Sequence, residues 1–503
     1  MKLILQAFEW YLPADAKHWE NLTKLTPKIK ELGISGVWLP PASKGAAGIN
    51  DVGYGIYDFY DLGEFDQKGT VSTKYGTKEE YIKLVESLQA QGIEAYADIV
   101  FDHMMGADES ETVKAVQYNF SNRLQPESGV EDVEVWTKFT FPGRAGKYND
   151  YIWTAKNFSG VDYDQRSKEH AIFAIQGQKW SPQVDDENGN FDYLMGANLD
   201  MSVPETVEQL EKWGHWFTDN VKIDGFRLDA VKHIDFHYFK TWLMNRQKQM
   251  GKDADLFVVG EYWSDEIGKL TNYLDESGNV LNLFDVPLHF NLYRASSSDG
   301  AFDMRDIFAG TLTDVRPDYA VTFVDNHDTQ EGQALQSWVQ GWFKEQAYAL
   351  ILLRKAGVPV VFWGDLMGIP SRKVGAVGTG LENMMKLRSQ FEMKQQSDYL
   401  DHPDVIGWTA LGDFDQEETG LAVILTNSKG GSKWMTIGAG QAHKVYVDLL
   451  GHNKDNIILN DEGRAEFPVN DGTVSIWIAQ EIAAELLSSA NDESENFLRN
   501  NKK

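Results

Sequence analysis

The hydrophobic positions of the first hundred residues follow two periodicities in turn. Apolar residues are nearly consecutive over 3–8, 36–39 and 94–100, as they are in strands buried on both faces. Between these runs, apolar side chains recur every three or four positions over 19–32 and 82–88, and a glycine follows soon after each segment. Helical spacing that stops at a glycine predicts a helix. The resulting order of strand, helix, strand, helix and strand predicts a parallel sheet covered by helices.

The same alternation resumes after residue 204. A helical pattern over 207–217 leads into an apolar run over 223–228. Four further apolar runs bring the predicted strands to eight: 256–259, 281–286, 321–324 and 358–362. Eight such repeats predict a (β/α)8 TIM barrel, in which catalytic residues lie at the C-terminal ends of the strands. We predict that this catalytic barrel comprises residues 1–102 and 205–392.

Two stretches break the alternation. Residues 103–204 are rich in loops, aromatic residues, Asp and Asn, which predicts an inserted, loop-rich β domain after the third strand. Residues 393–480 contain short apolar strands separated by turns, which predicts a C-terminal antiparallel β-sandwich. The polar tail over 481–503 has few apolar positions, so we expect either a loose terminal helix or a disordered segment.

The charge balance narrows the range of partners. The chain has 47 Lys and Arg against 76 Asp and Glu, a formal charge of −29. Such a surface repels nucleic acid and anionic membranes, whereas a neutral carbohydrate is not disfavoured. We therefore expect no nucleic acid and no membrane as partner, and no obligate protein partner is evident in the sequence.

The absence of cysteine excludes disulfides, thiolate catalysis and cysteine metal sites. The apolar stretch after Met1 is too short for the core of a signal peptide, and no apolar run could span a bilayer. These features predict a cytoplasmic protein, although a mature secreted form with an added Met would have a similar N-terminus.

Three predicted strands each end at a carboxylate. In the run 224–233, strand alternation places Arg227 and Asp229 on the same face. Taken alone, this pair fits a structural ion pair equally well. Glu261 and Asp328, however, also follow buried apolar runs. Because the C-terminal ends of barrel strands meet on one face, the three carboxylates predict a single site.

Paired carboxylates suit the cleavage of a glycosidic bond. Arg227 holds Asp229 ionised, as a nucleophile requires, while neighbouring negative charges are expected to raise the pKa of Glu261 and make it a proton donor. In a retaining enzyme the two groups lie about 5–5.5 Å apart. His103 and His327 flank the same strand ends, where they are placed to hydrogen-bond sugar hydroxyls, although a lone histidine is more often structural.

Several segments resemble those of a known family. Four of them look like the signature regions of the α-amylase family of glycoside hydrolases: 98–103, 225–233, 260–263 and 323–328. Segments 52–58 and 188–195 narrow the resemblance to liquefying bacterial α-amylases and their cytoplasmic relatives. The resemblance covers about 3–480, and it implies retaining endo-hydrolysis of α-1,4-glucosidic bonds in soluble malto-oligosaccharides, starch or glycogen.

The resemblance also implies roles for single residues. Asp229 corresponds to the nucleophile, Glu261 to the general acid/base and Asp328 to the group that stabilises the transition state. Tyr54 corresponds to an aromatic platform under the sugar, although a buried core tyrosine is the plainer alternative. The remaining residues implied to bind substrate are His103, Arg227, Lys232, His233, Trp263 and His327.

Family members hold a structural Ca²⁺, so the resemblance implies one here. Its expected ligands are Asp102, Asp192, Asn198 and the carbonyl of His233. Asp102 and Asn198 are exchanged relative to the usual pattern, which keeps the charge of the ligand set suited to this hard cation. The plainer alternative is that these acids are solvated loop residues.

A second metal cluster of close relatives is weaker in this sequence. Asp162 and Asp200 match it, but Ser181 stands where another carboxylate is usual, so we expect one calcium ion and not several.

Other functions stay open at this point. Exo-acting maltogenic cleavage or transglycosylation would use the same residues, and the loops around the cleft decide between them. Trp363, Leu366 and Met367 stand where tyrosines are common in the family, which affects the preferred length of the substrate. A non-catalytic glucan-binding relative would require lost carboxylates, and all three are present. An unrelated barrel enzyme with metal chemistry is disfavoured because no two-histidine metal spacing appears.

Overall fold

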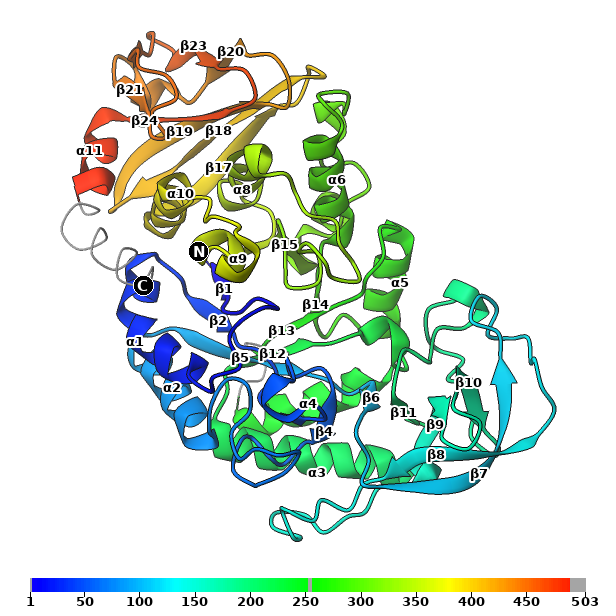
Figure 1. Ribbon diagram of the computed structural model, residues 1–503. Coiled ribbons are helices and arrows are strands. Elements are labelled where there is room, and N and C mark those ends of the chain that lie inside the picture. Colours follow the sequence, from blue (N-terminus) through cyan, green and yellow to red (C-terminus); the bar gives the residue numbers. More distant parts are fainter. Residues whose placement is uncertain (1, 252–255, 489–503) are drawn as a thin grey trace. The chain divides into compact units, whose positions relative to one another are not determined.

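The computed structural model describes residues 2–251 and 256–488 (Figure 1). Eight strands form a closed barrel in the order β1-β16-β15-β14-β13-β12-β5-β2. The pairs β1–β16, β2–β5, β5–β12, β12–β13, β13–β14 and β15–β16 are parallel. The predicted TIM barrel is therefore confirmed. Its strands are β1 Ile4–Gln6, β2 Gly36–Trp38, β5 Glu94–Ile99, β12 Gly225–Leu228, β13 Phe257–Gly260, β14 Asn282–Phe284, β15 Ala320–Phe323 and β16 Val358–Phe362.

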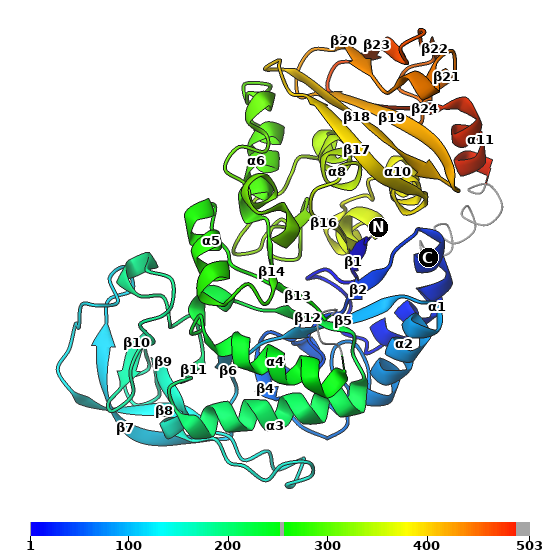
Figure 2. The same cartoon turned by 180° about the vertical axis from the view of Figure 1, so that it is seen from behind.

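Helices lie between most of these strands in the sequence, and local signals define their ends. The N-terminus of α2 is closed by reciprocal hydrogen bonds between Thr77 and Glu80. The last turn of α3 ends at Lys222, which adopts a left-handed conformation. Figure 2 shows α3 and α4 side by side, where Arg246 of α4 forms an ion pair with Glu211 of α3. The main helices are α1 His18–Glu31, α2 Lys78–Ala90, α3 Pro204–Val221, α4 Tyr238–Met250, α5 Ile267–Glu276, α6 Val286–Ser297, α7 Leu312–Val315, α8 Lys344–Leu352, α9 Trp363–Met367 and α10 Thr379–Gln390.

The contacts within the chain divide it into two compact units. One comprises Leu12–Pro27 and Gly36–Phe284, and it contains Asp229 and Glu261. The other comprises Met1–Tyr11, Lys28–Ser35 and Asp285–Lys503, and it contains Asp328.

The insertion after β5 is more regular than the loop-rich domain that we expected. Its six strands form one sheet in the order β6-β11-β9-β10-β7-β8. In β8, Val133 and Val135 are buried while Glu134 and Trp136 point to the other face. The charged residues at alternate positions make such strands look like polar loops in the sequence. The strands are β6 His103–Met104, β7 Glu109–Tyr118, β8 Glu131–Lys138, β9 Phe158–Asp164, β10 Glu169–Ile175 and β11 Ala197–Leu199.

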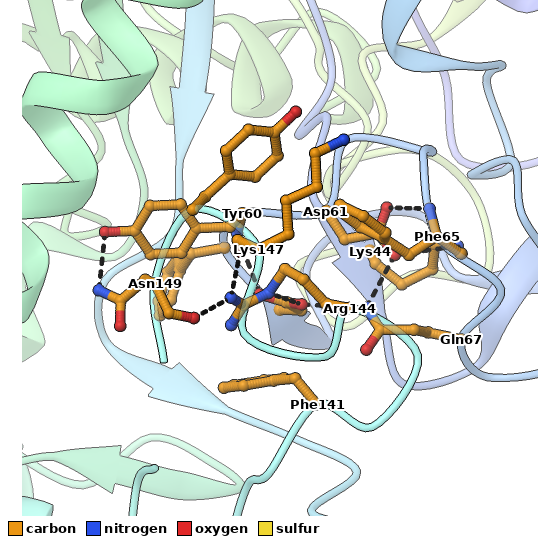
Figure 3. Close-up of polar contacts among 12 residues, drawn as sticks. Lys44, Tyr60, Asp61, Phe65, Gln67, Phe141, Arg144, Lys147 and Asn149 are labelled. Carbon is orange, nitrogen blue, oxygen red and sulfur yellow. Dashed lines mark hydrogen bonds and ion pairs between the residues drawn. The ribbon is translucent and has the colours of Figure 1, made fainter. Parts of the chain in front are cut away.

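A buried charge cluster, part of which Figure 3 shows, joins this insertion to β4 (Ile56–Asp58) and the residues on either side of it. The Nε of Arg144 lies 2.8 Å from Oδ2 of Asp58, and Nζ of Lys44 lies 3.3 Å from Oδ2 of Asp61. Gln67 bridges the two pairs, because its Nε2 donates to both carboxylates at 2.9 Å. Burial raises the pKa of Asp58 and lowers that of Lys44.

The C-terminal region is an antiparallel sheet domain, as predicted. One sheet has the order β17-β18-β19-β24-β21-β22, and β20 pairs with β23 in a second. Trp408 and Trp477 are fully buried in it. The strands are β17 Phe391–Tyr399, β18 Val405–Phe414, β19 Glu417–Thr426, β20 Gly431–Thr436, β21 Val445–Asp448, β22 Ile457–Ile458, β23 Arg464–Val469 and β24 Val474–Ala479.

The expected tail begins as a packed helix. In α11 (Gln480–Ser488), Ile482, Ala483 and Leu486 are buried. Residues 489–503 lie outside the described part of the chain. Among the described residues, no helix is both long and apolar enough to cross a membrane.

Candidate active site

Arg227 of β12 lies at the centre of three carboxylates. Its side chain is 1% exposed. Nη1 lies 2.8 Å from Asp98 and 2.5 Å from Asp229, and Nη2 lies 3.1 Å from Glu261. The parallel register explains this convergence, because Arg227 pairs with Asp98 of β5 and with Val259 of β13, two residues before Glu261. The expected placement of Arg227 and Asp229 on one face is confirmed.

One guanidinium thus faces three buried carboxylates, so the cluster carries an excess of negative charge. Burial raises the pKa of Glu261 to about 7; the charge of Asp229 adds to this rise and Arg227 opposes it. Burial and Asp229 likewise raise the pKa of Asp98 to about 6 against the attraction of Arg227. The expected direction for Glu261 is correct, but burial and not the neighbouring charge is the larger cause.

The backbone after β12 holds Glu261 in place. Ala230 has a left-handed conformation, with φ 51° and ψ 36°, which is unfavourable for a residue with a side chain. This turn lets its N–H donate to Oε2 of Glu261 at 2.9 Å. The same oxygen accepts from Arg227, so a single oxygen receives both hydrogen bonds. The other oxygen of Glu261 is left as the one that can present a proton.

Tyr54 and His103 lie beside the same cluster. The hydroxyl of Tyr54 donates to Oδ2 of Asp98 at 2.8 Å, and its ring centroid is 5.7 Å from the Arg227 guanidinium carbon. His103 contacts the carbonyl of Tyr54 through Nε2 at 2.8 Å and Asp102 through Nδ1 at 3.1 Å. Burial lowers the pKa of His103, but the hydrogen bond and charge of Asp102 outweigh it and raise the pKa above its ordinary value.

Lys232 and His233 follow on the far side of the Ala230 turn. Nζ of Lys232 lies 2.7 Å from Glu187 and donates to the carbonyl of Trp263 at 3.0 Å. Burial, with the charge of Lys232, lowers the pKa of His233 to about 3. His233 is therefore neutral, and its Nδ1 donates to the carbonyl of Phe191 at 2.7 Å.

Asp328 and His327 follow β15, and they belong to the other unit. Nε2 of His327 lies 3.2 Å from Oδ2 of Asp328. Gln6 donates to Nδ1 of His327 at 2.9 Å, which leaves the ring proton on Nε2, facing Asp328. The imidazole also stacks on Trp10, with 6.1 Å between ring centroids. The side chain of Asp328 is 24% exposed.

Three of the expected calcium ligands, Asp102, Asp192 and Asn198, form a buried anionic group. Nδ2 of Asn198 lies 3.1 Å from Oδ2 of Asp192, and Ser159 lies 3.3 Å from the same oxygen. Burial and the charge of Asp102 raise the pKa of Asp192 well above its ordinary value. Oδ1 of Asn198 and Oδ2 of Asp200 are buried without a hydrogen-bond partner among the described residues. A hard cation would satisfy the Asn198 oxygen and offset the charges of Asp102 and Asp192, so these residues fit calcium, whereas Asp200 belongs to the weaker second cluster.

Other observations bear on metals. No group of three or more His, Cys, Asp or Glu side chains suited to a metal occurs in the described ranges. The expected ligand set contains only two carboxylates, and its other oxygens belong to an amide and a backbone carbonyl. Of the weaker second cluster, Ser181 donates to Asp235 at 3.0 Å, and Asp162 accepts from the N–H of Gly196 at 3.3 Å.

A family model described as "Alpha amylase, catalytic domain" matches residues 17–405. The chain belongs to the α-amylase family. The match runs from α1 through the barrel and its insertion to the start of the C-terminal domain.

Curated relatives of this α-amylase family member cover nearly its whole length. It is 49% identical to an α-amylase of Geobacillus stearothermophilus over 477 residues, 94% of this chain and 86% of that protein. Identity to a glucan 1,4-α-maltohexaosidase of Bacillus sp. strain 707 is 46% over 478 residues, 94% and 92% of the two chains. Identity to the cytoplasmic α-amylase of Escherichia coli K12 is 41% over 493 residues, 95% and 99% of the two chains.

Solved structures agree at the level of the fold. An Anoxybacillus α-amylase aligns with a TM-score of 0.61 at 17% identity, over 95% of this chain and 97% of that one.

Asp98 belongs to the same carboxylate cluster, although the sequence alone does not predict it. It is buried, and it binds Arg227, Tyr54 and Nε1 of Trp38, the last at 3.0 Å. A carboxylate inside the apolar run 94–100 is itself a signal, since a buried charge requires a partner. The partner becomes identifiable only through the register of β5 with β12.

Proposed function

We propose that the protein is a retaining endo-acting α-amylase, which cleaves α-1,4-glucosidic bonds in soluble malto-oligosaccharides, starch or glycogen. The arrangement of Asp229 and Glu261 around Arg227 carries the proposal. Asp229 lies 2.5 Å from the guanidinium, whereas burial keeps Glu261 partly protonated near neutral pH. One ionised and one protonated carboxyl group are what double displacement at a sugar requires.

In the first step, Glu261 donates its proton to the glycosidic oxygen while Asp229 attacks the anomeric carbon. The bond to the leaving sugar breaks, and a covalent glycosyl ester forms on Asp229. In the second step, the Glu261 carboxylate takes a proton from water, whose oxygen displaces Asp229 from the same carbon. Two inversions give net retention.

Asp328 is proposed to stabilise the sugar in the transition state. His327 is proposed to orient the Asp328 carboxylate through the 3.2 Å contact between the two side chains. Tyr54 would lie under the sugar, with His103 and Arg227 beside it. Lys232, His233 and Trp263 would contact the sugars on the leaving side. These roles correspond to the family motifs, and the contacts among the side chains support them.

We also propose one structural calcium ion, bound by Asp102, Asp192, Asn198 and the carbonyl of His233. When bound, it would supply positive charge to a buried anionic group. Asp102 also contacts Nδ1 of His103 at 3.1 Å, so this proposed calcium ligand directly adjoins a residue proposed to bind the sugar.

A cytoplasmic location is proposed because a cytoplasmic α-amylase matches the chain over nearly all of both lengths. The formal charge of −29 supports a neutral glucan as substrate and disfavours nucleic acid or membranes as partners.

The test is NMR of the first products from maltoheptaose, comparing the native protein with Glu261→Gln. Short oligosaccharides that appear first as the α-anomer, and are lost in the variant, would support a retaining endo-amylase. A single small product from one chain end would indicate exo-cleavage, and longer chains would indicate transglycosylation. No turnover with calcium supplied would refute hydrolysis.

A further inference from the structure

A buried ionic cluster lies behind the turn that carries Asp328. Lys344, the first residue of α8, is 2% exposed. Its Nζ lies 2.5 Å from Oδ2 of Asp325 and 2.8 Å from Oδ1 of Asp365. The hydroxyl of Tyr348, one turn further along α8, donates to Asp365 at 2.7 Å. The cluster therefore joins the end of β15, the start of α8 and the helix α9 after β16, all within one unit.

Two buried carboxylates share this single ammonium group. Burial of such a group costs free energy that its ion pairs often do no more than offset. Burial and the charge of Asp365 raise the pKa of Asp325 to about 7 against the attraction of Lys344. A gain in stability therefore does not explain why the cluster is present. Its hydrogen bonds to the neighbouring turn suggest another role.

Asp325 is hydrogen-bonded directly to that turn. Its Oδ1 accepts from the hydroxyl of Thr329 at 2.6 Å, and the Thr329 hydroxyl accepts from the N–H of Asn326 at 3.0 Å. The side-chain oxygen of Asn326 then accepts from the N–H groups of Asp328 at 2.8 Å and Thr329 at 2.9 Å. Hydrogen bonds therefore fix the backbone on both sides of Asp328, although no regular helix or strand contains it.

We propose that Lys344 is a positioning residue, which holds Asp325 and, through Thr329 and Asn326, fixes the direction of the Asp328 carboxylate. This inference rests on the proposed role of Asp328 in the transition state. Since a displacement of about 1 Å at a reacting group can lower a rate by about 10²-fold, the turn requires this rigid support.

The test begins with Thr329→Val, which removes the hydroxyl but keeps the shape and charge of the site. We expect kcat to fall about 10- to 100-fold with little change in KM. Thr329→Ser restores the hydroxyl and should restore kcat. Lys344→Gln should lower kcat in the same way. If Lys344→Gln does not fold, as judged by near-UV circular dichroism, the same measurement is made with Asp325→Asn, which keeps an acceptor for Thr329 but removes the charge that Lys344 holds.

Tyr348→Phe is the matched control. It removes hydrogen bonds to Asp365 and from the N–H of Phe362, neither of which belongs to the turn. It should lower the melting temperature while kcat stays within about twofold. A fall in kcat for this control equal to that of Thr329→Val would show that general loosening, and not positioning, is responsible.

The decisive readout is coupling to Asp328. Rates are measured with a nitrophenyl malto-oligosaccharide, whose good leaving group keeps weak variants measurable. In an Asp328→Asn background, Thr329→Val should cause no further loss. Additive losses, or an unchanged kcat for Thr329→Val alone, would overturn the positioning role. If Asp328→Asn itself retains nearly native activity, the proposed function of Asp328 fails instead, and the positioning inference fails with it.

Discussion

Replacing Glu261 by glutamine should stabilise the fold at alkaline pH while it abolishes catalysis. In the folded protein, burial and Asp229 raise the pKa of Glu261 from 4.5 to about 7. A carboxyl group with a raised folded pKa contributes stability that is present below pH 4.5 and lost as the pH rises through 7. Above pH 7, the native protein therefore carries an ionised, buried carboxylate that destabilises the fold.

The variant is mild for a structural reason. Both hydrogen bonds to Glu261, from Arg227 and from Ala230, go to the single oxygen Oε2. The oxygen of a glutamine amide at that position keeps both. The titration of Glu261 alone should then lower the free energy of unfolding of the native protein by roughly 2–3 kcal/mol between pH 5 and pH 9. Because the charges of Arg227 and Asp229 also act on Glu261 in the folded protein, we take about 1 kcal/mol as the minimum.

The assay is urea unfolding of the native protein and Glu261→Gln at pH 5 and pH 9, with the exposed Glu466→Gln as control. The free energy of unfolding of Glu261→Gln relative to the native protein should rise by at least about 1 kcal/mol between the two pH values. For Glu466→Gln this difference should not change. An equal or smaller relative stability of Glu261→Gln at pH 9 would refute the burial argument. The kcat/KM of the native protein should fall as the pH rises, with an apparent pKa near 7, because Glu261 must carry its proton to act as the acid.

Three other outcomes can be measured directly. Arg227→Met should abolish activity and lower the free energy of unfolding by about 3–5 kcal/mol, since it leaves buried carboxylates without their cation; equal stability in thermal melts would contradict this. Arg144→Met should destabilise by a similar amount by leaving Asp58 unpaired, and activity measured well below the melting point should persist. EDTA should lower the melting temperature of the native protein but not that of Asp192→Asn. An equal response of both proteins to EDTA would count against a calcium site at Asp192.

The barrel could be predicted from the sequence because its strands are buried on both faces and therefore appear as apolar runs, as at 256–259. The insertion itself could be predicted from the break in that alternation, but its regular strands could not, since strands such as β8 alternate Val133 and Val135 with charged residues and resemble loops. Asp229 and Glu261 could be selected because each ends such a run. Asp98 could not, because its partner Arg227 is 129 residues away and only the register of β5 with β12 brings the two together.

The main cause of the raised pKa of Glu261 also could not be predicted from the sequence. Neighbouring acids can be counted along a chain, but burial of Glu261, the larger cause, is a property of the packed fold. The same is true of the cluster of Lys344, Asp325 and Asp365, which are distant in sequence and carry no motif spacing of their own.

The charge cluster of Figure 3 limits how this protein can be recombined with its relatives. Arg144 belongs to the insertion, whereas its partner Asp58 and the bridging Gln67 precede β5. In a chimaera that exchanges residues 103–204 alone, Asp58 and Gln67 would face the residue that the relative has in place of Arg144, within a buried ion network. The exchangeable block therefore begins near Lys44, and it includes Tyr54, so a transplanted insertion brings part of the proposed active site with it.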